Sequence, residues 1–69
     1  MISASVIGQR IKNLRESKGM TQEAFCNAVG ITQPALSNYE TGLRIPRDEV
    51  KLRIARCFDT SIEAIFYAD

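Results

Sequence analysis

Carboxamide and hydroxyl side chains gather in one short stretch of the chain, residues 32–41 (TQPALSNYET). Gln33 and Asn38 can each donate and accept a hydrogen bond at once, which allows paired bonds to an adenine edge worth about 1–3 kcal/mol of discrimination. Ser37 lies between them. The chain has no histidine, no glycine-rich phosphate loop and no plausible pair of base and nucleophile. This chemistry favours recognition over catalysis, and we expect no enzyme activity, no cofactor, no small-molecule ligand and no metal site.

Two arginines follow this stretch in the loop of residues 43–47 (LRIPR). Arg44 and Arg47 lie near the place where a backbone phosphate would run if the preceding helix entered a DNA groove. The alternative is that both are ordinary solvated loop charges.

The elements that must position these side chains are two short helices joined by a tight turn, residues 21–40 (TQEAFCNAVGITQPALSNYE). Thr21 and Thr32 are good N-caps, and Gly30 ends the first helix where a left-handed residue is needed. Pro34 falls in the first turn of a helix expected over 33–41, where its missing N–H costs no bond. This is the helix-turn-helix pattern, whose second helix can lie in the major groove. An ordinary helical hairpin in a small bundle is the alternative.

Three further helices are expected around this unit. A helix over 5–18 follows from the spacing of Ile7, Ile11 and Leu14, with Ser3 or Ser5 as its cap and Gly19 as its stop. A helix over 48–58 and a short one after the cap Ser61 complete the set, and no stretch has the pattern of a strand. Their apolar positions are Val50, Ile54, Ala55, Phe58, Ile62, Ile65 and Phe66. Leu52 points away from this face, as an ordinary exposed leucine or as a partner contact.

Length and charge limit the classes of protein to consider. The 69 residues suffice for one domain. The net charge is only +1, but residues 1–58 hold nine basic against five acidic side chains, while residues 59–69 hold three acidic and no basic ones. A basic body with an acidic end suits a domain that meets phosphate on one side. Scattered solubilising charge is the alternative.

The two cysteines and the apolar runs bear on the compartment. No apolar run is long enough for a membrane span and no signal peptide is evident, so we expect a cytoplasmic protein without membrane partners. Cys26 and Cys57 stand apart, and we interpret both as small buried apolar residues rather than a disulfide. Cys26 is placed where two helix backbones would approach closely.

The sequence resembles the Xre/Cro-like helix-turn-helix family, which includes the lambdoid phage repressors and many small bacterial regulators. The matching pieces are IKNLRESKGMTQ (11–22), VGITQPALSNYETG (29–42), Pro46, IARCF (54–58) and SIEAIF (61–66). The resemblance implies an all-α fold: a compact five-helix bundle of the lambda repressor-like type, with the helix-turn-helix formed by helices 2 and 3. Residues 1–69 would then be a single DNA-binding domain.

The resemblance also implies roles for individual residues. Positions that face the bases are matched by Gln33, Pro34, Ser37 and Asn38. Positions that contact the DNA backbone are matched by Gln22, Thr32, Thr41, Arg44 and Arg47. For Gln22, the free N–H groups and the dipole at the start of a helix also favour an anion. Pro34 departs from the polar residue often found there, and we expect it to make apolar contact, for example with a thymine methyl.

Arg15 and Glu40 match a family pair that bridges the first and third helices, and we expect this ion pair to fix the third helix against the scaffold. Cys26 and Cys57 replace alanine-like positions. Lys51 stands where the family has a leucine, with Leu52 shifted by one, which leaves the start and tilt of the fourth helix open.

The family commonly dimerises through the end of the domain. The candidates for the dimer interface are Leu52, Ile62, Ile65, Phe66 and Tyr67. The alternative for Ile62, Ile65 and Phe66 is that they belong to the core.

The function implied is a bacterial or phage-encoded, sequence-specific regulator of transcription, most simply a repressor. It would bind double-stranded DNA as a homodimer on a near-palindromic operator. Open alternatives are an antitoxin, a restriction–modification controller, or a protein-interaction module that has lost DNA binding. A toxin or antagonist protein would be a further partner.

Overall fold

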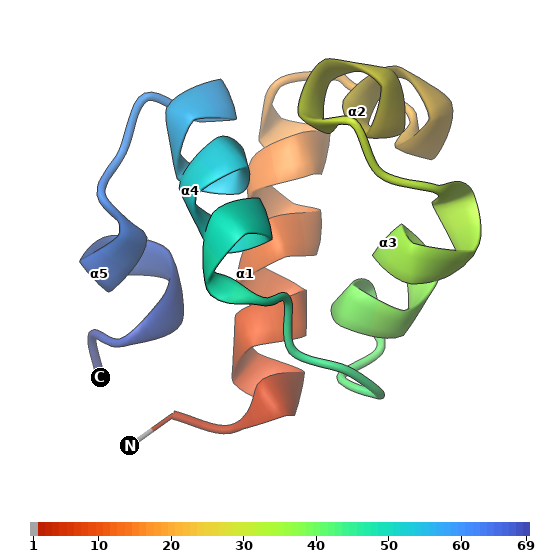
Figure 1. The fold of residues 1–69 in the computed structure, drawn as a ribbon. Coiled ribbons are helices and arrows are strands. Elements are labelled where there is room, and N and C mark those ends of the chain that lie inside the picture. Colours follow the sequence, from red (N-terminus) through yellow and green to blue (C-terminus); the bar gives the residue numbers. More distant parts are fainter. Residues whose placement is uncertain (1) are drawn as a thin grey trace.

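Five helices make up the computed structural model, which describes residues 2–69 (Figure 1). Their bounds are α1 Ala4–Ser17, α2 Gln22–Val29, α3 Gln33–Glu40, α4 Asp48–Cys57 and α5 Ile62–Phe66. No strand occurs in this part of the chain, so the all-α prediction is confirmed. The predicted bounds were off by one residue at both ends of α1 and at the C-terminal ends of α3 and α4. None of the described helices is both long and apolar enough to cross a membrane.

Side-chain caps start four of the five helices, each through an oxygen that accepts from the backbone N–H three residues on. The distances are 3.2 Å for Ser3 to Val6, 3.0 Å for Thr21 to Ala24, 3.2 Å for Thr32 to Ala35 and 3.1 Å for Ser61 to Ala64. Ser3 rather than Ser5 therefore caps α1. Helix α4 has no such bond at Arg47, and Asp48 and Glu49 instead place negative charge in its first turn.

The core collects the apolar face of every helix. Phe25 of α2 stacks on Phe58 just after α4, with ring centroids 5.3 Å apart. Ile7 and Ile11 of α1 are buried as the spacing predicted, whereas Leu14 is only partly buried. The remaining buried apolar side chains are Cys26, Val29, Leu36, Val50, Ile54, Ala55, Ile65 and Phe66.

Helix α1 is the central helix of the molecule. Helix α3 packs against one side of α1 and α5 against another, while α2 packs against both α3 and α4 (Figure 1). Helix α4 closes the remaining side through contacts with α2 and α5. This arrangement leaves one long flank of α3 without a covering helix.

The backbones of two helices approach closely at Gly8, a position that the sequence analysis did not select. A Cβ atom at Gly8 would lie 2.3 Å from the carbonyl oxygen of Tyr39 and 2.6 Å from that of Glu40. The C-terminal end of α3 therefore rests directly on the backbone of α1, which only glycine permits. Cys26 is a buried side chain in the same core, and the close approach expected at its position stays a prediction.

The two cysteines differ in their surroundings. Cys26 is buried, as predicted, and burial raises the pKa of its thiol. Cys57 is only partly buried at the end of α4, so the prediction of two buried cysteines holds for one of them. Both are free thiols.

Candidate nucleic-acid interface

Helix α3 has an inward and an outward side that its sequence assigns clearly. Leu36 lies fully in the core and Tyr39 is partly buried against it. Gln33 and Pro34 are exposed in the first turn of the helix, which Thr32 caps. As expected, Pro34 occupies a first-turn position where it removes no intrahelical bond.

The two carboxamides of α3 are available to a ligand. Gln33 is exposed and Asn38 is partly exposed, and neither side-chain amide forms a hydrogen bond within residues 2–69. The backbone carbonyl of Asn38 is engaged, because it accepts from the N–H groups of Leu43 and Arg44 at 2.9 and 3.1 Å and from Thr41 Oγ1 at 3.4 Å. The structure thus brings Gln33, Ser37 and Asn38 to the uncovered flank of α3.

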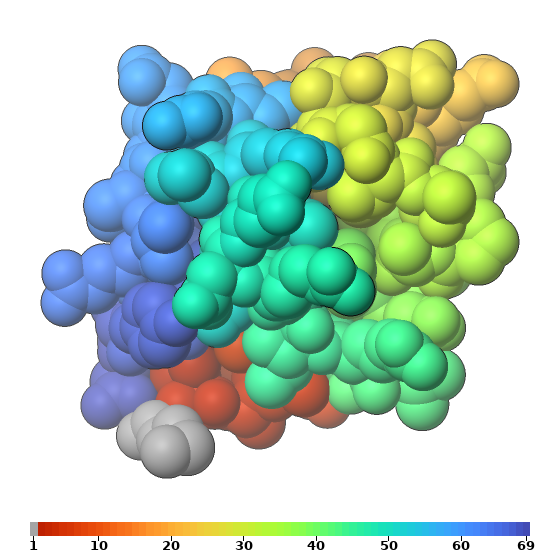
Figure 2. Space-filling view, viewed as in Figure 1, coloured from red at the N-terminus to blue at the C-terminus, as the bar shows by residue number. Residues whose placement is uncertain are grey.

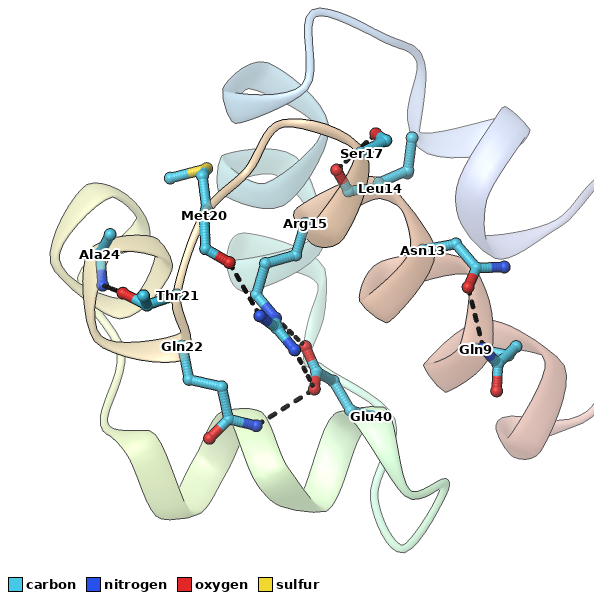
Figure 3. Close-up of polar contacts among 10 residues, drawn as sticks. All are labelled: Gln9, Asn13, Leu14, Arg15, Ser17, Met20, Thr21, Gln22, Ala24 and Glu40. Carbon is cyan, nitrogen blue, oxygen red and sulfur yellow. Dashed lines mark hydrogen bonds and ion pairs between the residues drawn. The ribbon is translucent and has the colours of Figure 1, made fainter.

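An ion pair ties the C-terminal end of α3 to the other helices (Figure 3). Arg15 Nε donates to Glu40 Oε2 at 2.7 Å, and Arg15 Nη1 donates to the carbonyl oxygen of Met20 at 2.8 Å. Arg15 is only 8% exposed, and its pKa is raised above the ordinary value because it donates to the Glu40 carboxylate. The pair lies between α1 and α3 as the sequence predicted.

Gln22 belongs to the same network. Its Nε2 donates to Glu40 Oε1 at 3.1 Å, so one amide hydrogen is used inside the protein (Figure 3). The second hydrogen remains for an anion at the start of α2. Sequence reasoning assigned Gln22 to phosphate alone and missed its bond to Glu40, because that bond joins residues 18 positions apart.

A polar recess of about 270 Å³ opens beside this network. Its lining residues are Lys12, Arg15, Gln22, Ser37, Glu40 and Thr41. Lys12 is exposed and has no ion-pair partner within residues 2–69, so it is the cation of this recess that an external anion can reach. The sequence analysis did not select Lys12, although its place one helical turn before Arg15 could have pointed to it.

The other residues assigned to the DNA backbone are exposed, two at the ends of α3 and two in the loop between α3 and α4. Thr32 Oγ1 already accepts the capping bond, and Thr41 Oγ1 donates to the Ser37 carbonyl at 2.9 Å. Arg44 and Arg47 extend from the loop between α3 and α4, which the buried Pro46 anchors. The loop arginines and the α3 amides therefore belong to consecutive segments of the chain.

The candidate dimer residues separate into two groups. Ile65 and Phe66 are each 2% exposed, so they belong to the core, and their assignment to a dimer interface was wrong. The reason is that α5 has only five residues and uses its apolar side chains to cover α1 and α4. Leu52 is 39% exposed and Tyr67 is 55% exposed, while Ile62 is partly buried.

Lys51 accounts for the position of Tyr67. Its Nζ donates to Tyr67 Oη at 2.9 Å and lies 4.8 Å from the centre of that ring and 5.6 Å from the centre of Phe66. The lysine thus joins α4 to the end of the chain through cation–π contacts. Helix α4 still begins at Asp48, as the sequence predicted.

The fold agrees with comparisons to known proteins. The sequence matches the Helix-turn-helix family over residues 11–65, and the chain belongs to that family. It is 31% identical over 58 residues to the uncharacterized HTH-type transcriptional regulator YqaE of Bacillus subtilis (strain 168), an alignment that covers 84% of this chain. The chain spans 50% of the length of that relative.

Two solved structures share the arrangement of helices. The restriction-modification controller protein C.AhdI from Aeromonas hydrophila superposes with a TM-score of 0.84 at 27% identity, over 91% of this chain and 96% of that one. The P22 c2 repressor, solved in complex with a synthetic operator, superposes with a TM-score of 0.87 at 25% identity, over 93% of this chain and 97% of that one. The predicted helix-turn-helix fold is confirmed.

Proposed function

We propose that residues 1–69 act as one domain of a transcriptional regulator that binds double-stranded DNA in a sequence-specific manner. The observation that carries this proposal is the uncovered flank of α3, where Gln33 and Asn38 have free side-chain amides. With α3 in the major groove, Gln33, Pro34, Ser37 and Asn38 contact base edges. Amides that form no hydrogen bond within residues 2–69 keep their donors and acceptors for base edges.

Phosphates on either side of the groove hold α3 in position. Gln22 and Thr32 lie at the starts of α2 and α3, where free N–H groups and the helix dipole favour an anion. Thr41, Arg44 and Arg47 meet the backbone beyond the other end of α3, and Lys12 adds a contact from α1. These contacts set the register of the protein on the duplex but carry no sequence information themselves.

Two copies bind together in this proposal, because one such domain makes few base contacts and linkage of two raises the affinity. A symmetric dimer requires half-sites about 10–10.5 base pairs apart, or a small multiple, centre to centre. With Ile65 and Phe66 in the core, the surface for the second copy consists of Leu52, Ile62 and Tyr67.

The regulatory outcome follows from where the operator lies. Occlusion of a promoter gives repression, which is the role named for the similar P22 c2 repressor. The likeness to C.AhdI favours a second candidate, a controller of a restriction–modification system. An antitoxin of the same fold would add a toxin partner without changing the DNA surface. Each of these roles is exerted by binding, without catalysis, and each places the protein in the cytoplasm.

Selection of bound fragments from random duplex DNA at a stated salt concentration tests the proposal. We expect an enriched motif with twofold symmetry and the half-site spacing given above, since two copies of α3 must enter the same face of the helix. Enrichment of an asymmetric site would contradict the proposed symmetric dimer but not the proposed DNA binding. No enrichment over input, with folded protein, would contradict DNA recognition and favour a module that binds only proteins.

A further inference from the structure

A second surface recess, of about 380 Å³, lies between the ends of α2 and α4, and we call it the α2–α4 groove. It is lined by Ala28, Val29, Arg53, Arg56 and Cys57. Ala28 and Val29 contribute aliphatic carbon atoms, Cys57 contributes a thiol, and the two arginines contribute guanidinium groups. In Figure 2 the yellow end of α2 and the cyan-to-blue end of α4 meet along the upper part of the molecule.

The groove carries positive charge that the chain does not fully neutralise. Arg53 Nη2 donates to Glu49 Oε1 one turn earlier on α4, and its Nη1 lies 3.7 Å from where a Cβ of Gly30 would be. Arg56 has neither an ion pair nor a hydrogen bond through its side chain within residues 2–69. Both arginines are exposed, so their remaining N–H donors can reach a ligand.

The groove is separate from the surface proposed for DNA. None of its residues is among those assigned to bases or phosphates. Helix α3 packs against α1 and α2, whereas α4 packs against α2 and α5, so the groove is formed on the α4 side of α2 (Figure 1). A ligand in the groove therefore leaves the flank of α3 free.

We propose that the α2–α4 groove binds an acidic segment of another protein. An aliphatic side chain of the partner would enter the recess against Val29 and Cys57, and carboxylates beside it would pair with Arg53 and Arg56. Guanidinium groups pair with carboxylates through two parallel hydrogen bonds, and they are less strongly hydrated than ammonium groups, which suits a contact next to apolar surface.

Charge argues against the other occupants. A symmetric contact of the groove with a second copy would bring the arginines of both copies face to face, and like charges in contact disfavour association. Proteins bind a nucleic-acid backbone with a row of cations, or with aromatic rings on which the bases stack. The α2–α4 groove instead has two arginines beside aliphatic side chains. A short acidic and apolar peptide fits both features.

The test uses the isotope-labelled chain without DNA, so its outcome is independent of the DNA proposal. The probe is the capped peptide acetyl-Glu-Asp-Leu-Glu-Asp-amide, and its matched control is acetyl-Gln-Asn-Leu-Gln-Asn-amide. We expect the acidic peptide to produce saturable shifts of the amide signals of the groove residues, and the neutral peptide to produce none. Arg56→Gln should weaken the binding about threefold, as for a solvent-accessible charge pair, and the double variant with Arg53→Gln should weaken it further.

Arg44→Gln is the control variant, because Arg44 is an exposed arginine outside the groove, and it should bind the acidic peptide unchanged. Equal shifts with both peptides, shifts on α3 and its loop instead, or an unaffected double variant would each overturn the proposal. Groove signals that move with protein concentration alone would assign the surface to a second copy. The same shifts with random-sequence duplex DNA would assign it to nucleic acid.

Discussion

Each side chain of α3 has a role that its place around the helix decides. Leu36 is fully buried and holds the helix to the core, while Gln33 and Asn38 keep unbonded amides on the outer flank. Glu40, at the end of the helix, accepts from both Arg15 and Gln22. The residues proposed for recognition thus differ from those that anchor the helix, so mutation can test the two roles separately.

Replacement of Gln33 or Asn38 by Ala should relax the base preference at single operator positions. The physical reason is that one paired amide contact contributes about 1–3 kcal/mol of discrimination at one base pair. Binding to a panel of single-position operator variants measures this effect. An equal loss of affinity on every sequence would contradict the assigned base contacts.

Replacement of Glu40 by Gln should destabilise the fold by about 3–5 kcal/mol, because it leaves the buried guanidinium of Arg15 without its counter-charge. Denaturant unfolding measures the change. The matched control is Glu49→Gln, which removes the exposed partner of Arg53 and should cost less than about 1 kcal/mol. Similar losses of unfolding free energy for the two variants would show that the Arg15–Glu40 pair contributes no more to stability than an exposed ion pair.

At the scale of the elements, the position of α3 depends on two contacts that lie far apart in the sequence. Gly8 allows the carbonyl oxygens of Tyr39 and Glu40 to approach the α1 backbone, and the Arg15–Glu40 pair locks the same end of the helix. The N-terminal end of α3 is set locally by the cap Thr32. The direction in which the outward flank of α3 faces therefore depends on α1 as much as on the turn that precedes α3.

Replacement of Gly8 by Ala should destabilise the protein by about 1–3 kcal/mol and move α3 away from α1, because a Cβ at this position would overlap two backbone oxygens. Unfolding curves and operator affinity measure the two effects, and both should be impaired. Gln9→Ala, at an exposed position of the same helix, is the control and should change the stability by no more than about 0.5 kcal/mol. A Gly8→Ala variant as stable as this control would contradict the close packing.

At the scale of the whole molecule, charge separates the surfaces. Lys12 lies in the polar recess beside α3, Arg44 and Arg47 lie in the loop after α3, and two more arginines line the α2–α4 groove. The only charged side chains of residues 59–69 are acidic. Such a distribution orients the protein toward a polyanion while the net charge stays near zero. The salt dependence of DNA binding measures the effect of this charge distribution.

Arg44→Ala and Lys12→Ala should each weaken operator binding on all sequences and reduce the slope of log affinity against log salt by about one unit. The slope falls because each variant releases one fewer counterion from the DNA. Lys18→Ala, which removes an exposed lysine that is not assigned to DNA, is the control and should leave the slope unchanged. An unchanged slope for Lys12→Ala would show that the polar recess does not contact a phosphate.

Most of the fold and part of the site could be predicted from the sequence, because the signals are local. The caps Thr21, Thr32 and Ser61 and the left-handed Gly30 act within a few residues, and they define where helices begin and end. The amides of α3 were found from their residue types in a capped helix, which is also a local signal. Their contact with bases stays a prediction.

Contacts between distant residues were decided only by the tertiary structure. Ile65 and Tyr67 look alike as apolar residues near the end of the chain, yet one is in the core and the other lies on the surface beside Lys51. The bond from Gln22 to Glu40, the approach of α3 to Gly8 and the α2–α4 groove likewise exist only once the helices are packed. Helical periodicity limits which side of a helix is apolar, but which neighbour covers that side depends on how all five helices share one core.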